Sequence, residues 1–555
     1  MVIYGLHTGH DSASAKIEEN KLIYSHELEK FNQPRYSYIK TAYHANSLIP
    51  NFNCDNDSLI ISGEQHLGQI EVDGKFAYYS SVGYASGIGD NPLKTKKSIL
   101  DFFGSYIPIE TTYHTTCHLV GSYCCSPFMK RGEDAFVCMW DGGVNAMVFY
   151  ISYDNLSIKY LGDASLFNGN VFSYISLYWG PLKLPGAIHN DFRGFTEEMH
   201  ERLDRTKPDH LNWRGAPGIL MAYQGLGKYN EKIVPLLKTI EEKSGEHFPR
   251  GWDYKKMSNA LRQFSDEDII ATIYGYLGQT TMDNLADFVR SNKKKTPNMI
   301  LTGGCALNIK WNSYFRSLNV CNEVWAPPFP NDCGIALGAA TTKMVLQNKS
   351  WEFDWDVYRG QELITSGYTK PYKEKWKRTK CSLTRLAEIL YYDDEPIVFL
   401  KGRAELGPRA LGHRSILASP KNLNMKQRLN EVKGRASFRP VAPICMEEHA
   451  PEYFTPGTPD PFMLFDHEVK EEVKDFIPAV IHVDNTARLQ TINEDQEPDV
   501  YELLFQFYQL SGIPMLCNTS ANDKGKGFFP SLTSALDWER TKYVWAEGYL
   551  YEKVD

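Results

Sequence analysis

The sequence predicts a mixed α/β protein with at least two domains. Residues 1–30 and 135–153 each have the pattern of a β-hairpin with chemically active side chains near a turn, and a helix–strand–Gly-Gly–helix pattern follows after residue 270. The chain has 555 residues, more than one hydrophobic core usually holds. Its hydrophobic content of 42% and charged content of 23% are those of an ordinary globular protein.

The composition argues against several classes of protein. A net charge of -8 gives no general attraction to nucleic acid or to anionic membranes. No apolar run approaches the roughly 20 residues that span a bilayer, and the first residues lack the charged and apolar regions of a signal peptide. The 11 cysteines include no Cys-x-x-Cys pair, which is typical of reduced thiols. We therefore expect a cytoplasmic protein with no membrane partner.

The first hairpin pattern has strands at residues 2–6, 16–17 and 22–28, with a loop of small and polar residues at 7–15. Backbone N–H groups in such a loop can approach an anion closely. The second pattern has strands at 135–140 and 146–151, joined by Asp141-Gly142-Gly143. A long helix is predicted over 271–292, and a strand at 299–302 then enters the turn Gly303-Gly304 before another helix. This order is typical of an actin-like or sugar-kinase-like ATPase domain, in which the hairpin loops face the phosphates.

Four separated residues form a candidate metal site. His114 and His118 are four residues apart, so a helix would place both imidazoles on one face. Asp141 and Asp332 lie in turn-like contexts, and two His with two Asp form a mixed N/O set that suits iron, manganese or zinc. The alternative is a partly buried helix whose histidines bind backbone carbonyls. Convergence of the four residues depends on the fold.

The second half of the chain is rich in arginines near turn residues. A change to clustered charges at 344–380 predicts the domain junction, and a strand at 396–400 then leads into a run with three arginines among glycines. Further basic or polar turn segments occur at 430–440, 484–488 and 517–520. Isolated arginines usually form weak surface ion pairs. Four such segments instead predict a pocket for a highly anionic ligand, such as ATP or an acyl phosphate.

Over essentially its whole length the sequence resembles the O-carbamoyltransferase family, which includes nodulation-protein-U type, cephem and tobramycin carbamoyltransferases. The resemblance rests on the His114/His118 pair and on six short segments, namely His10-Asp11-Ser12-Ala13, Asp141-Gly142, Gly303-Gly304-x-Ala306-Leu307-Asn308, Gly407-Pro408-Arg409-Ala410-Leu411-Gly412, Phe438-Arg439-Pro440-Val441-Ala442-Pro443 and Asn518-Thr519-Ser520. The segment at 407–412 followed by the segment at 438–443 is a highly specific combination.

The resemblance implies an actin-like ATPase-type domain over residues 1–360 and a YrdC-like domain over 381–555. In this family the C-terminal domain forms carbamoyl-adenylate from carbamoyl phosphate and ATP, with Mg²⁺ accompanying the ATP. The N-terminal domain then transfers the carbamoyl group to an acceptor hydroxyl beside a bound metal, which is usually iron in this family. For this chain we expect Fe²⁺ or another divalent transition metal. We expect the acceptor to be a natural-product sugar or alcohol or a hydroxymethyl group, with a hydroxymethylated pyrimidine in DNA as the alternative.

The family's functional residues map onto this sequence. His10 is the implied catalytic base, because an imidazole titrates near neutral pH and can accept the proton of a hydroxyl. The implied metal ligands are His114, His118, Asp141 and Asp332. Carbamoyl phosphate and ATP would contact Arg409, Lys433, Arg439, Arg488, Asn518, Thr519 and Ser520. The adenylate in the first domain would contact Gly142, Gly303, Gly304 and Asn308.

Two other interpretations remain open at this point. One is a carbamoyl- or threonylcarbamoyl-adenylate enzyme of hydrogenase maturation or tRNA modification, although the acylphosphatase domain and zinc-finger cysteines of the hydrogenase type are not visible. The other is a non-catalytic scaffold that binds ATP and metal, for which the basic segments of the second half would have no use. A homodimer is compatible with each. The sequence also departs from the family pattern at Ile219, at Ala521 and at Thr8-Gly9, all near the implied active-site rim.

Overall fold

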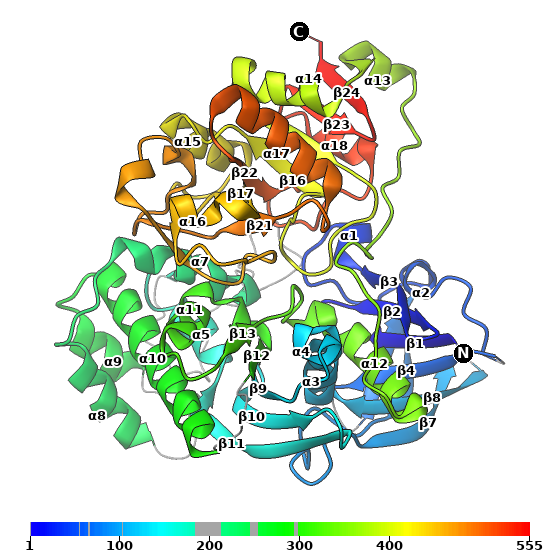
Figure 1. Cartoon of the computed structure of the whole chain (residues 1–555). Helices are drawn as coiled ribbons and strands as arrows, with labels where there is room; N and C mark the ends of the chain where they lie inside the picture. The colour runs from blue at the N-terminus through cyan, green and yellow to red at the C-terminus, as the bar shows by residue number, and fades with distance from the viewer. Residues whose placement is uncertain are drawn as a thin grey trace.

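The computed structural model describes residues 2–54, 56–64, 67–102, 104–183, 213–244, 254–292 and 298–554. The N-terminal part, residues 2–353, forms the lower half of Figure 1, and the C-terminal part, residues 363–554, lies above it. Both parts contain β-sheets covered by helices, so the predicted mixed α/β class is confirmed. The predicted division at 360 and 381 stays a prediction.

The N-terminal part is built on two sheets with the same local strand order. The described strands of the first have the order β3 (Lys21–Glu27), β2 (Ala13–Glu18), β1 (Val2–His7), β4 (Ser58–Gly63), β8 (Ser105–Tyr113) and β7 (Thr95–Phe102). Those of the second have the order β11 (Ser157–Asn168), β10 (Val144–Ser152), β9 (Ala135–Asp141), β12 (Asn298–Thr302) and β13 (Glu323–Trp325). In each sheet the first three strands in this order are antiparallel to their neighbours, and the next two run parallel to the third. The two predicted hairpins, which contain β1 with β2 and β9 with β10, therefore occupy equivalent places in the two sheets.

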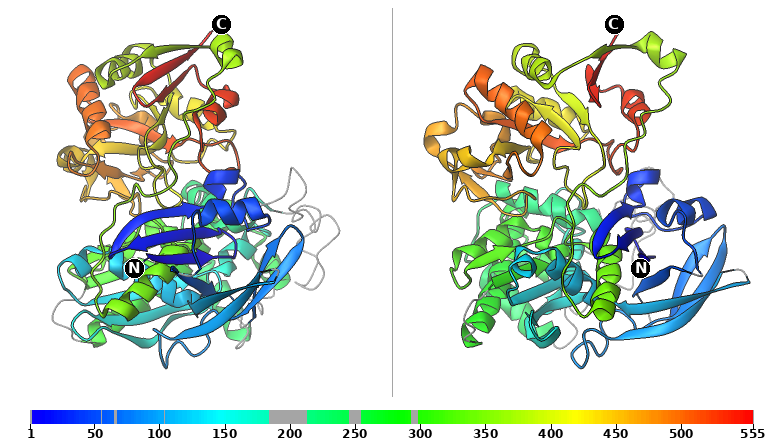
Figure 2. Two further views of the ribbon diagram at one scale, coloured as in Figure 1. Left: turned by 90° about the vertical axis from the view of Figure 1, so that its right-hand side faces the viewer. Right: turned by 45° about the vertical axis from the view of Figure 1, so that its right-hand side comes forward.

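Two helices lie between these sheets, α3 (His114–Cys125) and α12 (Ile335–Asn348), as Figure 1 and Figure 2 show. Both helices are almost entirely buried. Helix α3 contacts strands of both sheets, and α12 contacts strands of the first sheet and α3. A glycine permits their close approach, because a Cβ on Gly338 would lie 2.0 Å from the carbonyl oxygen of Cys117. Helix α3 starts at His114, directly after the end of β8. The packing of the two helices therefore fixes the position of this histidine between the sheets.

The outer face of the second sheet is covered by α10 (Asp266–Ser291) and α11 (Ile309–Ser317). The predicted helix over 271–292 is confirmed, but it starts five residues earlier. Ser265 caps it by accepting a hydrogen bond from the Asp268 N–H at 3.2 Å, and three acidic residues follow in the first turn. This is the N-terminal chemistry that stabilises a helix against its dipole.

The C-terminal part has one large mixed sheet with helices on it. Its described strands have the order β14 (Trp376–Lys380), β24 (Tyr549–Lys553), β23 (Tyr543–Ala546), β15 (Ile397–Leu400), β16 (Arg414–Ala418), β22 (Met515–Ser520), β17 (Ala442–Met446) and β21 (Gln490–Ile492). Helices α14 (Leu383–Glu388), α15 (Leu423–Val432), α17 (Pro498–Ser511) and α18 (Leu532–Trp538) contribute apolar side chains to its core. The active-site candidates of this part come from the loop after β15, the end of α15 and the loop after it, the segment after β20 (Thr486–Ala487), and the last residues of β22.

Buried polar contacts join the two parts. The Lys30 ammonium binds the Glu27 carboxylate at 2.8 Å and the carbonyl oxygens of Glu405 and Gly407 at 2.6 and 2.8 Å. Glu27 also accepts the Gly407 N–H at 2.8 Å, so this buried pair holds the loop that carries Arg409. On the opposite side of the interface, Lys310 of α11 binds the carboxylates of Asp466 and Asp484 at 2.8 and 2.7 Å.

The remaining elements are short and lie around these layers, and none of the described helices is both long and apolar enough to cross a membrane. They are α1 (Glu29–Asn32), α2 (Ala42–Leu48), β5 (Leu67–Val72), β6 (Lys75–Ser80), α4 (Pro127–Lys130), α5 (Asn170–Ile175), α7 (Ala216–Tyr223), α8 (Val234–Ser244), α9 (Tyr254–Leu261), α13 (Lys370–Lys375), α16 (Ala450–Tyr453), β18 (Phe454–Thr455) and β19 (His467–Val469). The cytoplasmic location stays a prediction.

Candidate active site

The four predicted metal ligands converge in the N-terminal part. His114 and His118 lie on one face of α3 with ring centroids 5.1 Å apart, Asp141 ends β9, and Asp332 lies in the turn before α12. One ligand atom from each residue can be chosen so that all four lie within 4.8 Å of one another, and all four side chains are buried. The predicted convergence is therefore present in the fold.

The chemistry of this cluster fits a divalent transition metal. The Nε2 atoms of His114 and His118 are buried without a hydrogen-bond partner among the described residues, and they lie 3.5 and 3.6 Å from Asp332 Oδ1. Burial lowers the pKa of His114, but the carboxylates of Asp332 and Glu64 outweigh it and raise that pKa well above its ordinary value. Two orphaned imidazole nitrogens facing a buried carboxylate are a donor set that a cation would satisfy.

Two residues outside the predicted set support these side chains. Glu64 accepts a hydrogen bond from His114 Nδ1 at 3.1 Å, which leaves Nε2 as the ring atom that faces Asp332. The Tyr84 hydroxyl donates to Asp141 Oδ2 at 2.6 Å, and the Tyr84 ring stacks on His114 with a centroid distance of 4.1 Å. Neither residue lies in a recognisable motif, so only the fold reveals them.

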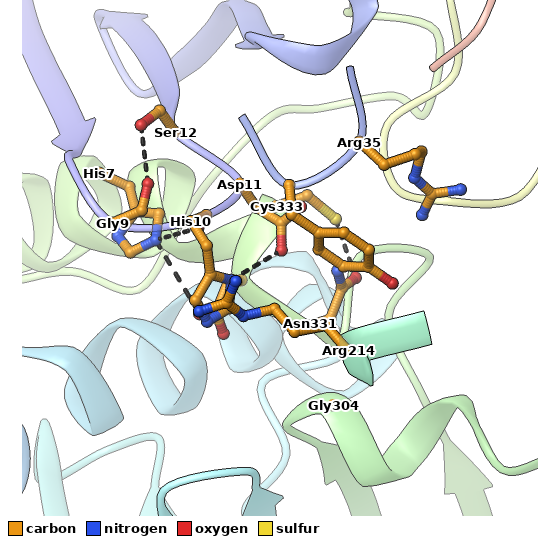
Figure 3. Close-up of polar contacts among 12 residues, drawn as sticks. His7, Gly9, His10, Asp11, Ser12, Arg35, Arg214, Gly304, Asn331 and Cys333 are labelled. Carbon is orange, nitrogen blue, oxygen red and sulfur yellow. Dashed lines mark hydrogen bonds and ion pairs between the residues drawn. The ribbon is translucent and has the colours of Figure 1, made fainter. Parts of the chain in front are cut away.

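His10 lies beside this cluster on the loop between β1 and β2. Its Nε2 is 3.3 Å from Asp332 Oδ2 and its Nδ1 is 3.1 Å from Asp11 Oδ2, and a third of the side chain remains exposed. Figure 3 shows His7 beneath the loop, where its Nε2–H donates to the His10 carbonyl at 2.8 Å. Burial lowers the pKa of His10, but Asp332 and Asp11 raise it to about 9. The imidazole is thus partly exposed beside the metal-ligand candidate Asp332, and Asp332 and Asp11 favour its protonated form.

The loop departs from the family pattern at Gly9, and the structure supplies a reason. A Cβ at this position would lie 2.9 Å from the His7 ring and 3.1 Å from a Glu64 carboxylate oxygen. A larger residue there would therefore displace either the support of His10 or the support of His114. The other two departures lie in different environments. Ile219 lines the cavity described below, and Ala521 is fully buried.

The Gly-Gly turn lies opposite His10. Gly303 has φ +86°, and a Cβ on it would lie 2.4 Å from the Trp140 carbonyl oxygen, so the position requires glycine. The next N–H, of Gly304, donates to Asp141 Oδ1 at 2.8 Å. Asn308 caps α11 by accepting the N–H groups of Lys310 and Trp311. The turn thereby ties the metal-ligand candidate Asp141 to the predicted adenylate site.

The C-terminal part contributes a cluster of incompletely paired arginines. The Nε atoms of Arg409, Arg439 and Arg488 are buried and have no hydrogen-bond partner in the described parts of the chain. Burial lowers the pKa of Arg409 well below its ordinary value, and repulsion from Arg488 and Arg439 adds to this effect. The same two causes lower the pKa of Arg488 to about 10. Buried cations that repel one another in this way form a site for an anion.

Lys433 and the predicted residues of β22 complete the description of this region. The Lys433 ammonium donates to the carbonyl oxygens of Ser520 and Asn522, each at 2.6 Å, and so ties the end of α15 to the end of β22. Burial and then the nearby Arg435 lower the Lys433 pKa well below its ordinary value. Asn518 has a different place, because its amide donates to the Ala410 carbonyl and to Gln490, behind the loop of Arg409.

One cavity of about 1460 Å³ extends through both parts of the protein. It is lined by the predicted residues His10, Asp141, Gly142, Gly304, Asn308, Asp332, Arg409, Lys433, Arg439 and Ser520. The other predicted residues, His114, His118, Gly303, Arg488, Asn518 and Thr519, lie outside its described lining. The structure therefore brings ten predicted residues from distant segments around a common space, and the other six lie outside its described lining.

Comparison with protein families agrees with this two-part organisation. Residues 104–341 match the model of the carbamoyltransferase N-terminus, and residues 387–553 match that of the carbamoyltransferase C-terminus. These matches place the chain among the transferases. The chain belongs to the O-carbamoyltransferase family, as its resemblance at the motif level predicts.

Full-length relatives support the same assignment. A nodulation protein U from Rhizobium tropici is 37% identical over 100% of this chain and 96% of the relative. A 3'-hydroxymethylcephem-O-carbamoyltransferase from Amycolatopsis lactamdurans is 29% identical over 97% of this chain and 96% of the relative. Among solved structures, T. kodakarensis HypF is 13% identical and covers 63% of this chain and 48% of its own, but its TM-score of 0.33 is too low to support an argument.

Proposed function

We propose that the protein is an ATP-dependent O-carbamoyltransferase with two reaction centres. The C-terminal part would form carbamoyl-adenylate from carbamoyl phosphate and ATP, and the N-terminal part would transfer the carbamoyl group to an acceptor hydroxyl. The observation that carries this proposal is the single cavity, because it joins the arginine cluster to His10 and the metal-ligand candidates. A reactive intermediate made at one end could reach the other end without passing through solvent.

The proposal includes the finer fold assignment. We assign the N-terminal part to the actin-like class, and the matching strand orders of its two sheets support this assignment. The C-terminal part would be the YrdC-like domain, supported by its single mixed sheet with phosphate-suited loops at the strand ends. The domains would comprise residues 1–360 and 381–555.

Adenylation would take place at the arginine cluster. Carbamoyl phosphate first loses its phosphate to water and yields carbamate, whose oxygen then attacks the α-phosphorus of ATP and expels pyrophosphate. Arg409, Arg439 and Arg488 would stabilise the anionic phosphoryl groups during these steps, because their charges are buried and incompletely paired. Lys433 lies at the junction of α15 and β22 and would support the same groups. Mg²⁺ would accompany the ATP.

Transfer would take place at the other end of the cavity. The acceptor hydroxyl attacks the carbamoyl carbon, a C–O bond forms, and AMP leaves while His10 accepts the hydroxyl proton at Nε2. Asp11 holds the other ring nitrogen and so orients the imidazole. Because Asp332 raises the pKa of His10 to about 9, action as a base near neutral pH requires that the charge of Asp332 be neutralised. His114, His118, Asp141 and Asp332 would hold Fe²⁺ or another divalent transition metal, which supplies polarisation of the carbamoyl oxygen when bound.

The acceptor is proposed to be an alcohol of a small molecule. One relative is named for a hydroxymethyl acceptor, which favours a hydroxymethyl group or a sugar hydroxyl over other nucleophiles. Ile219 and Phe438 line the cavity together with polar groups, so the acceptor would need both apolar and hydrogen-bonding surface.

Release of pyrophosphate from ATP, measured with and without carbamoyl phosphate and without any acceptor, tests the proposal. We expect release that depends on carbamoyl phosphate, and a loss of at least about a hundredfold in Arg439→Ala, because removal of a preorganised charge donor typically costs that much. Lys375→Ala is the control, since Lys375 is an exposed lysine that pairs with Glu539 and lies outside the described lining of the cavity. Absence of release in metal-loaded wild-type protein, with a mixed pool of alcohols also present, would refute the assignment.

A further inference from the structure

The loop between β15 and β16 carries Arg409, and its backbone is bonded on both sides of that residue. Before Arg409, the Gly407 N–H donates to Glu27 at 2.8 Å. After it, two carbonyl oxygens of the loop accept hydrogen bonds at 2.9 to 3.0 Å from the side chains of Asn518, Tyr358 and Gln490. The Arg409 guanidinium itself bonds weakly, with Nη2 3.4 Å from the Leu307 carbonyl oxygen. The backbone of the loop therefore decides where this guanidinium lies.

Glu405 lies inside the same loop and collects three of its N–H groups. The side chain is fully buried, and its Oε1 accepts the N–H groups of Leu411, His413 and Arg414 at 2.7, 2.7 and 3.0 Å. Three donors on one oxygen hold this part of the loop around the carboxylate. The other oxygen, Oε2, is buried and has no hydrogen-bond partner in the described parts of the chain. The carboxylate thus fixes the second half of the loop.

Arg414, at the end of the loop, binds carbonyl oxygens from its beginning. Its side chain is buried, and the guanidinium donates to the carbonyls of Lys401 and Gly402 at 2.6 and 2.9 Å. Burial lowers the pKa of Arg414 to about 10, and the charge of Glu405 limits the fall. Two buried side chains of opposite charge therefore close the loop through its own backbone. Removal of the carboxylate would leave buried N–H groups without an acceptor, which is unfavourable in a folded loop.

Glu405 lies outside the described lining of the common cavity, so an effect of this residue on ligand binding has to pass through another residue. We propose that Glu405 is a positioning residue of the C-terminal centre, whose carboxylate holds the loop so that Arg409 faces the phosphoryl groups of the substrates. The inference rests on the proposed function and deepens it by naming what preorganises the anion site. A loop that is ordered before the anion arrives saves the entropy that ordering would otherwise cost on binding.

A double-variant cycle tests this role without relying on catalysis. Pyrophosphate is the probe, and its Kd is measured by calorimetric titration. We expect Arg409→Ala and Glu405→Leu each to raise the Kd at least tenfold. Because Glu405 acts through Arg409, the double variant should bind within threefold of Arg409→Ala alone. A general structural role predicts instead that the two losses multiply, and that result would overturn the proposal.

Two conservative variants extend the cycle. Glu405→Gln keeps an oxygen that can accept the three N–H groups, so we expect it to recover part of the loss seen in Glu405→Leu. Glu405→Asp keeps the carboxylate but is one methylene shorter, and it replaces Glu405→Leu in the cycle if that variant does not fold. We expect Glu405→Asp to raise the Kd at least threefold, with no further loss when it is added to Arg409→Ala. An unchanged Kd in either folded Glu405→Leu or folded Glu405→Asp would contradict the proposal, as would a wild type that binds no pyrophosphate.

Asp134→Leu is the matched control for loss of a carboxylate that accepts a backbone N–H. Asp134 Oδ1 accepts the Tyr153 N–H at 2.8 Å in the N-terminal part, outside the described lining of the cavity. We expect this variant to lose thermal stability and to bind pyrophosphate within twofold of wild type. A loss of binding as large as that of Glu405→Leu would mean that destabilisation alone weakens the site, and would overturn the role of Glu405.

Pyrophosphate release separates this inference from the proposed function. If wild type shows no release that depends on carbamoyl phosphate, the proposed function fails, and the pyrophosphate-binding cycle still decides the role of Glu405. If wild type is active, we expect Glu405→Leu to lower kcat/KM for ATP at least tenfold and to add no further loss to Arg409→Ala. Losses in kcat/KM that multiply in the double variant would refute the inference alone.

Discussion

The buried Lys30–Glu27 pair offers a quantitative test of how the two parts are held together. In Lys30→Met the Glu27 carboxylate loses its cation, and the carbonyl oxygens of Glu405 and Gly407 lose a donor. Burial, opposed by Lys30, already raises the pKa of Glu27 from 4.5 to about 7. Without Lys30 that pKa would rise further, so the folded protein would hold Glu27 protonated at pH 7. Removal of one partner of a buried pair typically costs about 3–5 kcal/mol, because the remaining charge and hydrogen-bonding groups lose their compensation.

This cost should appear as local opening of the loop that carries Arg409. Hydrogen–deuterium exchange followed by mass spectrometry reports it, because the Gly407 N–H is bonded to Glu27 at 2.8 Å. Since about 1.4 kcal/mol corresponds to a factor of ten, we expect exchange in residues 403–414 to accelerate between about a hundredfold and a few thousandfold. The defect should become smaller from pH 7 toward pH 5, because protonating Glu27 costs less as the pH approaches 4.5.

A double variant and a surface control make the test specific. Glu27→Gln combined with Lys30→Met removes both charges and keeps an acceptor for Gly407, so we expect it to restore most of the protection. Lys375→Met breaks an exposed pair with Glu539 and should change exchange less than about threefold. Acceleration of less than about fivefold in Lys30→Met would show that the pair is not what closes this loop.

Three further predictions concern the histidines. His10→Asn should abolish transfer to any alcohol that wild type carbamoylates while pyrophosphate release stays within about twofold of wild type, since His10 acts only at the transfer end; retained transfer would remove His10 from the mechanism. His114→Ala should lower the metal content of purified protein in elemental analysis, and an unchanged content would exclude it as a ligand. The third concerns His482, whose pKa burial and nearby cations lower from 6.5 to about 4. The unfolded chain then binds a proton that the folded chain does not, so stability from this group is lost as pH falls from 6.5 toward 4, by about 2 kcal/mol at pH 5. Thermal unfolding of His482→Gln should therefore be less sensitive than wild type to a change from pH 7 to pH 5, and equal sensitivity would contradict this reasoning.

Local patterns were sufficient to predict the elements that position the N-terminal centre. The strands at the two hairpins, the long helix and the helical face shared by His114 and His118 all follow from short-range periodicity. The convergence of Asp141 with Asp332 is different, because 191 positions separate them and only the packing of α3 and α12 between two sheets brings them together. For these residues the prediction depended on the family resemblance.

Other features depend on tertiary contacts that no motif records. Glu64 and Tyr84 act on His114 and Asp141 from separate loops, and each is an ordinary polar residue in its own sequence context. Asn518 stays a predicted ligand contact, and the structure adds that its amide nitrogen bonds to the Ala410 carbonyl of the loop that carries Arg409. A motif shows which residues are functionally important more readily than it shows whether a residue contacts the ligand or positions another residue that does.

The size of the common cavity has a consequence for chemical competition. One molecule confined in a space of about 1460 Å³ is equivalent to a solution of roughly 1 mol per litre. An intermediate kept there meets His10 at a concentration that no free metabolite in a cell would reach. Weak affinity of the transfer end for the intermediate would then be no disadvantage. Selection for discrimination could act almost entirely on the alcohol, which must enter from outside.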